Sequence, residues 1–143
     1  YQPTHNDVIL NDTVAVRISP IGSNFTESLY DEVNYKYGES KFIEGWGAVA
    51  NTIYIWLYQD NFNNYFSPYN TYDAAIESYR FCYENGAVLM FNQGQLIQIA
   101  PTAFAIFKDY INAKSYFNVN VNYKDVEETF FENYFMDAKE PIR

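Results

Sequence analysis

Aromatic rings, amides and a single carboxylate follow the apolar run at residues 53–58. They form the segment Trp56-Leu57-Tyr58-Gln59-Asp60-Asn61-Phe62-Asn63-Asn64-Tyr65-Phe66. A pyranose ring offers apolar C–H faces that stack on aromatic planes, while its hydroxyl groups need polar partners such as carboxylates and amides. Trp56, Tyr58, Asp60 and Asn61 are therefore candidate carbohydrate contacts. A polar turn over an aromatic core is the alternative interpretation of this loop.

A second group of amides follows the apolar run at residues 87–91. Asn92 and Gln93 precede Gly94, which suits a turn at the end of a strand. These two amides could recognise sugar hydroxyls, or they could satisfy backbone groups of the turn. Arg17 lies inside the apolar run at residues 14–18. A guanidinium there either faces a carboxylate inside the fold or marks an exposed edge.

Other catalytic and cofactor chemistries have little to build on. His5 is the only histidine and Cys82 the only cysteine, so a histidine-based triad, a cysteine metal site and an internal disulfide are not expected. Gly45-Trp46-Gly47 lacks the third glycine of a dinucleotide-binding motif. We therefore predict no metal and no cofactor, and we expect Cys82 to be a small core residue.

The composition excludes several classes of partner. The 143 residues include 9 Lys and Arg against 18 Asp and Glu, and the net charge of −9 opposes nucleic acid and anionic membrane surfaces. No apolar run approaches the roughly 18 to 20 residues that cross a bilayer. Aromatic residues make up 20% of the chain. Some rings must therefore lie on the surface, where they can meet a ligand or partner.

Three short β-rich runs alternate with segments of helical period. Strands are expected near residues 14–18, 53–58 and 87–91, and helices at 40–50, 71–85, 101–117 and after 122. The strand starts are 39 and 34 residues apart, which fits strand-loop-helix-loop units of roughly 30 residues or more. This alternation predicts an α/β fold with parallel strands. Ligands of such folds lie at the carboxyl ends of the strands.

The expected helix boundaries depend on particular residues. Ser40 is a candidate N-cap for the first helix, and Pro101 suits the first turn of the third. Helical spacing places Tyr83 on the buried face of the second helix and Phe104 on the buried face of the third.

A series of short pieces occurs in a definite order and spacing along the chain: Ile53 to Tyr58, Asn61-Phe62, Tyr65, Tyr79-Arg80-Phe81, Glu84-Asn85-Gly86, Phe91 to Gly94, Lys108-Asp109-Tyr110, Ala113-Lys114, Phe130, Tyr134 and Pro141-Ile142-Arg143. Their order and spacing resemble a known family, the domain of unknown function 4838. The resemblance covers nearly the whole chain from about Val14. It implies a bacterial protein that groups with the TIM-barrel glycoside hydrolases, of which this chain matches the last three or so strand-helix units.

Two departures from that family concern carboxylates. The family usually carries Trp-Asp-Tyr where this chain has Leu57 in the middle, and Phe-Glu-Gln-Gly where it has Asn92. Most glycosidases need two carboxyl groups, and an amide can replace neither. Asp60 could be half of a catalytic pair whose other half lies N-terminal to this chain, or it could cap a turn. An inactive relative that only binds carbohydrate is the alternative.

We therefore expect the C-terminal part of a TIM-type (β/α) barrel. A complete barrel typically needs about 200 residues or more, so residues 1–143 are expected to form a single partial barrel domain from a longer multidomain protein. The remainder of the barrel or self-association would cover the exposed edges. The expected partner is a carbohydrate, and the expected location is secreted or on a bacterial cell surface. A small α/β domain whose rings serve only its core or a protein interface is the plainest alternative.

Overall fold

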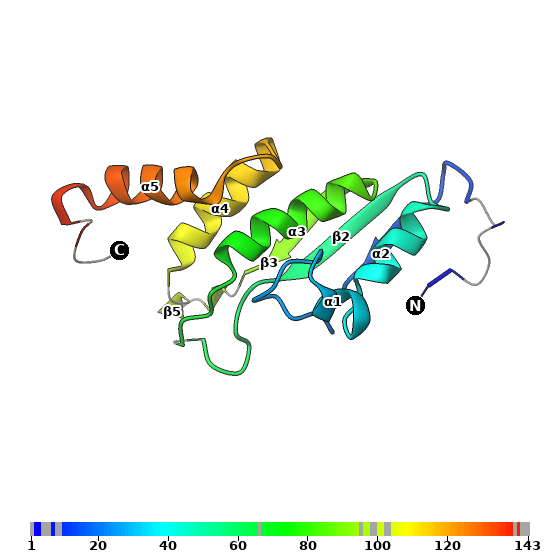
Figure 1. The fold of residues 1–143 in the computed structure, drawn as a ribbon, viewed down its shortest axis with the longest axis horizontal. Helices are drawn as coiled ribbons and strands as arrows, with labels where there is room; N and C mark the ends of the chain where they lie inside the picture. The colour runs from blue at the N-terminus through cyan, green and yellow to red at the C-terminus, as the bar shows by residue number, and fades with distance from the viewer. Residues whose placement is uncertain are drawn as a thin grey trace.

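Parallel strands alternate with helices through the first two thirds of the chain, and two further helices follow (Figure 1). The computed structural model describes residues 2–3, 7, 10–65, 67–94, 96–97, 100–101, 104–138 and 140. Within this part the elements are β1 (Val16–Ile18), α1 (Glu32–Lys36), α2 (Ser40–Gly47), β2 (Ile53–Tyr58), α3 (Tyr72–Glu84), β3 (Ala87–Gln93), β4 (Leu96–Ile97), β5 (Ala100–Pro101), α4 (Ala105–Phe117), α5 (Tyr123–Tyr134) and the 3-10 helix η1 (Met136–Ala138).

The three predicted strands form one parallel sheet in the order β1-β2-β3, which confirms the predicted α/β class. Val16 pairs with Ile53 at one end of the sheet, and Tyr58 pairs with Gln93 at the other. The carboxyl ends of β2 and β3 therefore meet at a common edge.

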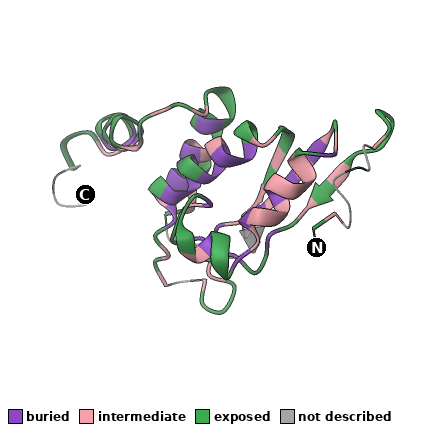
Figure 2. Cartoon of the chain, turned by 45° about the vertical axis from the view of Figure 1, so that its right-hand side comes forward, coloured by how far each residue is buried: buried purple, intermediate pink, exposed green. Residues whose placement is uncertain are grey.

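Alternate residues of β2 form the centre of the main core. Ile53, Ile55 and Leu57 are almost completely buried, whereas the residues between them are half-buried. Helices α2 and α3 pack against this face through Ile43 and Tyr79, among others. Figure 1 shows both helices in front of the sheet, and Figure 2 shows buried residues concentrated in α3. One face of the sheet is thus covered by helices. The aliphatic side chains of β2 point toward that face and its aromatic side chains toward the other, because successive side chains of a strand alternate between the two faces.

A second core lies between α3, α4 and α5. It contains Ile76, Phe107, Ile111, Val126, Phe130 and Phe131. The rings of Phe107 and Phe130 lie 4.8 Å apart between centroids. Aromatic packing therefore holds α5 to α4. None of the helices in the described part of the chain is long and apolar enough to cross a bilayer.

The prediction that Pro101 begins the third helix is wrong. Residues Ala100 and Pro101 form β5, which pairs antiparallel with β4. Helix α4 starts at Ala105, after Phe104 adopts a left-handed backbone conformation with φ of 55°. Phe104 is 45% exposed instead of buried, because it precedes the helix and helical spacing does not apply to it.

Three other expectations at element ends also need correction. Glu39 precedes the first turn of α2, so Ser40 lies inside the helix and is fully buried instead of capping it. Tyr83 is 60% exposed, and Figure 1 shows the last turn of α3 extending past α4. β1 begins at Val16 and not at Val14, because its pairing with β2 starts there. The sequence pattern also does not predict α1, whose five residues are too few for a clear helical period.

Candidate functional site

The candidate residues near the carboxyl ends of the strands divide between the two faces of the sheet. Leu57 pairs with Asn92 and Tyr58 with Gln93, and successive side chains of a strand point to opposite faces. Asn92 therefore shares the helix-covered face with Leu57, and Gln93 lies on the opposite face. We call this opposite face the uncovered face. By the same alternation, this face is formed by Arg17, Tyr54, Trp56, Tyr58, Leu89, Phe91 and Gln93.

Contacts on three sides hold the Trp56 ring on the uncovered face. Its Nε1 donates a hydrogen bond to Gln93 Oε1 at 3.0 Å. The guanidinium carbon of Arg17 lies 5.3 Å from the ring centroid, within cation–π range. The Phe91 ring meets it edge-on with centroids 4.7 Å apart. The structure thus brings together three of the predicted site residues, Arg17, Trp56 and Gln93.

A cavity of about 300 Å³ opens on the uncovered face. Leu89 and Phe91 are 51% and 47% exposed there, and neither apolar core of the described chain includes Tyr54, Trp56 or Phe91. Rings with a guanidinium and an amide beside them are groups that bind the apolar faces and the polar edges of a sugar. The cavity is lined by Arg17, Tyr54, Ile55, Trp56, Leu89 and Phe91.

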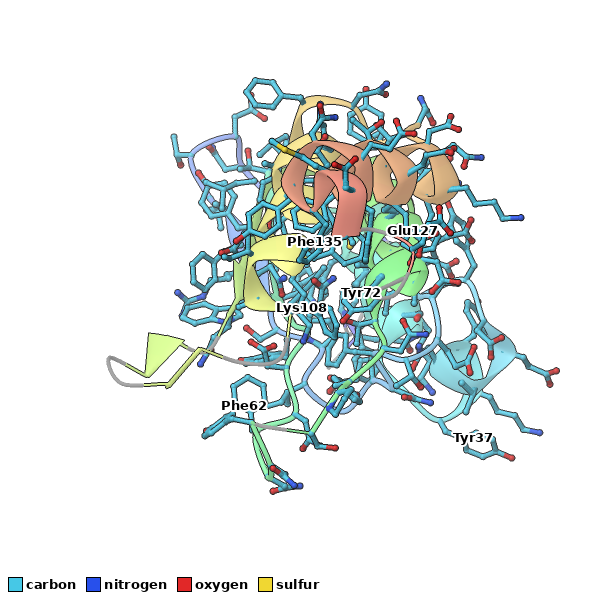
Figure 3. The ribbon with its side chains drawn as sticks, turned by 90° about the vertical axis from the view of Figure 1, so that its left-hand side faces the viewer. Tyr37, Phe62, Tyr72, Lys108, Glu127 and Phe135 are labelled. Carbon is cyan, nitrogen blue, oxygen red and sulfur yellow. The ribbon has the colours of Figure 1, made fainter. Side chains whose placement is uncertain are left out.

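A row of aromatic rings leads from the end of β2 into the following loop. Tyr58 lies between Phe25 and Phe62, with ring centroids 6.1 and 6.0 Å away, and Phe62 in turn contacts Tyr65. Figure 3 shows Phe62 on this loop. Tyr58 is therefore a half-buried packing residue that links the sheet to the loop, and its ring also lies 6.4 Å from that of Trp56.

Asn61 stabilises the loop itself. Its Oδ1 accepts hydrogen bonds from the backbone N–H groups of Asn63 and Asn64 at 3.1 and 3.2 Å. The side-chain oxygen thus shapes a turn, as amides at the start of turns commonly do.

The Asp60 carboxylate is buried in an ion pair with a helix residue. Lys108 Nζ lies 2.6 Å from Asp60 Oδ1 and also donates to the Gln59 carbonyl at 2.9 Å. Asp60 and Lys108 are each 7% exposed. Figure 3 shows Lys108 near the start of α4. This ion pair joins the loop after β2 to α4 and occupies one oxygen of the predicted catalytic carboxylate.

The Gln59 side chain connects the Asp60–Lys108 ion pair to residues of β3 and α3. Asn92 Nδ2 donates to Gln59 Oε1 at 2.5 Å, and the Tyr79 hydroxyl lies 3.2 Å from the same oxygen. Tyr79 also bonds Asn112 Oδ1 at 2.6 Å. Burial raises the pKa of Tyr79 well above its usual value, so the phenol stays neutral. We call Gln59, Asp60, Tyr79, Asn92 and Lys108 the polar cluster; its groups mainly bond one another.

Two neighbouring groups respond to the negative charge of Asp60. Burial, and then the Asp60 charge, raise the pKa of Asp109 on α4. The same two causes, in the same order, raise the pKa of Tyr72 at the start of α3. Asp60 and Asp109 thus lie close enough to interact, although the Asp109 side chain is largely exposed.

Two further features of the described residues concern clusters of metal-ligating side chains and the cysteine thiol. No group of three or more His, Cys, Asp or Glu side chains there could hold a metal ion. Cys82 is fully buried in the main core, and burial raises the pKa of its thiol, which makes it a poor nucleophile. His5 lies outside the described residues.

Sequence reasoning overlooked Lys108 as a site residue, although a signal for it exists. Lys108 follows Phe107 and precedes Ile111 by three positions, so it lies on the stripe of α4 that faces inward. A charged residue on an apolar stripe indicates a buried partner. Tyr79 lies in the main core, and its hydrogen bonds to Gln59 and Asn112 depend on contacts between distant segments that no local sequence pattern encodes.

Comparison with known proteins gives one finding about the family. No curated protein and no solved structure matches the chain. The model of the family described as Domain of unknown function (DUF4838) matches residues 1–143. The chain therefore belongs to the family of the domain of unknown function DUF4838.

Proposed function

We propose that this chain binds polysaccharide on the uncovered face, as part of a carbohydrate-active, glycoside-hydrolase-like bacterial protein. The observation that carries the proposal is the cavity of about 300 Å³ in which exposed Phe91 lies beside Trp56, Arg17 and Tyr54. Apolar C–H faces of a sugar stack on such rings, and the polar groups at the rim bond its hydroxyls. A site for polysaccharide would place the protein outside the cell, secreted or on the surface.

We further propose that the sheet is part of the wall of a TIM-type (β/α) barrel. Its strands are parallel and in sequential order, and α2 and α3 pack on the same face. In such a barrel the other face points toward the barrel axis, where side chains form a packed core, and ligands bind at the carboxyl ends of the strands. The ligand would then bind at the end of the uncovered face nearest those strand ends, around Trp56, Phe91 and Gln93. The rest of the barrel, or a second copy of the chain, would pair with the outer edges of β1 and β3.

Binding without hydrolysis fits the chemistry of the site better than catalysis does. A general acid or nucleophile must reach the glycosidic bond. Asp60 is 7% exposed and bonded to Lys108, and Leu57 and Asn92 supply no carboxylate. Leu57 is also completely buried on the helix-covered face. The noncatalytic carbohydrate-binding module is therefore the form of the proposal that we favour.

The proposal is tested by glycan array screening followed by calorimetry with the glycans that bind. Replacing Phe91 by alanine should weaken binding about fivefold or more, because it removes an exposed ring from the cavity, and an aromatic contact of this kind contributes about 1 kcal/mol or more. Phe117→Ala is the matched control, since Phe117 is 94% exposed at the end of α4. Absence of binding to every glycan, or equal loss in both variants, would contradict the proposal.

A second candidate function is hydrolysis with Asp60 as one of two carboxyl groups. It is favoured by the place of Asp60 at the carboxyl end of β2, where active sites of such barrels lie. Turnover of a bound glycan that is lost in Asp60→Asn, while glycan affinity is retained, would establish this activity. Binding without turnover in both proteins supports the binding module.

A further inference from the structure

We infer that the carbohydrate bound on the uncovered face is acidic, with a uronic-acid carboxylate that pairs with Arg17. This inference rests on the proposed function and names the class of sugar that the site would take. Arg17 is the middle residue of β1, pairs with Tyr54 on β2 and is exposed on the uncovered face.

Arg17 has no carboxylate partner among the described residues. The ion pairs in that part of the chain join Arg80 to Glu77 and Lys108 to Asp60. The Arg17 guanidinium lies over the face of Trp56, 5.3 Å from the ring centroid. In a chain with twice as many acidic as basic residues, a cation without an anionic partner beside a cavity is available for an anionic ligand.

The stacked position of Arg17 leaves its hydrogen-bonding groups usable. A guanidinium that stacks on an aromatic ring still carries five N–H donors in its own plane, arranged to bind both oxygens of a carboxylate. Trp56, in turn, is held by its bond to Gln93 and by Phe91. The Arg17 guanidinium therefore stacks on a tryptophan ring that is already held in place, which reduces the conformational entropy lost when a ligand binds.

The surroundings strengthen an ion pair at this position. Tyr54, Ile55, Trp56, Leu89 and Phe91 line the cavity together with Arg17. Apolar walls lower the local dielectric constant, so a carboxylate that approaches Arg17 there is attracted more strongly than in open solvent. The net charge of −9 opposes an acidic polysaccharide at long range. Recognition must therefore come from this local contact, which favours one carboxylate per bound segment over a densely charged polymer.

The test compares uronic-acid oligosaccharides with their carboxyl-reduced counterparts, which keep the backbone and linkages but lose the charge. Calorimetry on the protein should give at least tenfold tighter binding of an acidic form, since hydrogen bonds to charged groups are the stronger ones. Arg17→Gln should abolish this preference. Arg17→Lys should retain part of it, because lysine keeps the positive charge but lacks the planar set of donors that binds both carboxylate oxygens. Arg80→Gln, which removes a cation already paired with Glu77, should leave the preference unchanged.

The outcomes separate this inference from the function on which it rests. Equal affinity for acidic and reduced forms, a preference that survives in Arg17→Gln, or stronger binding of sulfated oligosaccharides that contain no uronic acid would overturn the inference while carbohydrate binding stands. Failure of every acidic and neutral glycan to bind would overturn the proposed function as well. Thermal unfolding of Arg17→Gln shows whether the variant folds, and the exposed position of Arg17 predicts that it does.

Discussion

The ion pair between Lys108 and Asp60 is the strongest constraint at the residue scale. Both groups are buried, and Lys108 also bonds the Gln59 carbonyl. Buried charges are tolerated when they are paired and hydrogen-bonded, and removal of one partner leaves the other without compensation. The pair therefore fixes the loop after β2 against α4.

Replacing Lys108 by methionine should lower the free energy of unfolding by about 3–5 kcal/mol, because the Asp60 charge then stays buried alone. Urea denaturation followed by circular dichroism measures this. The double variant Asp60→Asn/Lys108→Met should recover most of the loss, and Lys114→Met on the same helix, at an exposed position, is the control. Unchanged stability of Lys108→Met would show that the ion pair does not form.

The raised pKa of Asp109 predicts how the free energy of unfolding changes with pH. Burial and the Asp60 charge raise its pKa in the folded state, so ionisation of this carboxyl disfavours the folded form. Stability from this group is complete below the pKa of the unfolded chain and is lost as the pH rises through the folded-state pKa. Asp109→Asn should therefore be more stable than the wild type at neutral pH, and the difference should vanish in acid.

Urea denaturation at several pH values tests this, with Asp125→Asn as control. Asp125 lies in the first turn of α5, where a negative charge is favourable, so its replacement should not stabilise the protein. A gain for Asp109→Asn that is the same at every pH would contradict the assigned cause.

Residue types alone identified the amides and the carboxylate near the strand ends, because polar groups at those positions are visible in the sequence. They did not show that Asp60 and Asn92 face the helices while Trp56 and Gln93 face the other way. That division depends on strand register, and a shift of one residue exchanges the two faces. The structure defines this register through the pairing of Leu57 with Asn92, which the sequence pattern does not contain.

At the scale of elements, the end of α2 packs closely against the turn that follows α3. A Cβ atom on Gly47 would lie 2.6 Å from the carbonyl oxygen of Asn85, closer than van der Waals contact allows. Glycine at this position therefore permits the approach of the two elements, whereas no side chain would fit.

Gly47→Ala should accordingly lower the free energy of unfolding by about 1–3 kcal/mol through overpacking. Gly22→Ala is the matched control, because the nearest atoms to an added Cβ there belong to the flexible Glu39 side chain at 3.4 Å. Equal stability of the two variants in urea denaturation would contradict the close packing of α2 on the Asn85 turn.

The strands and longer helices could be predicted because their apolar residues recur with a clear period. Residues 53–58 of β2 agree with the expected range, and α3 differs from its range by one residue at each end. The start of α4 could not be predicted, because Pro101 suits a helical first turn and a short strand edge equally well. In the structure Pro101 belongs to the short strand β5, which pairs with β4.

At the scale of the whole molecule, the sheet has helices on one face and two unpaired edges within the described residues. Exposed edges and apolar faces promote association of chains. Val88 on edge strand β3 is 68% exposed. We expect the isolated chain to self-associate, and Val88→Lys to reduce the association because a charge on an edge strand opposes pairing.

Light scattering coupled to size-exclusion chromatography over a range of protein concentrations measures this. Tyr83→Lys, at an exposed position on α3, controls for the added charge. A stable, monodisperse monomer of the unmodified chain at all concentrations would contradict the expectation that its edges need cover.

The central claim, a carbohydrate site on the uncovered face, is tested most directly by nuclear magnetic resonance of the two tryptophan indole N–H groups. Trp56 lies on the uncovered face with its Nε1 bonded to Gln93, whereas Trp46 packs against the main core from α2. Addition of a glycan that binds should shift the Trp56 indole signal and leave that of Trp46 in place. A glycan that saturates the protein without moving the Trp56 signal would contradict the site.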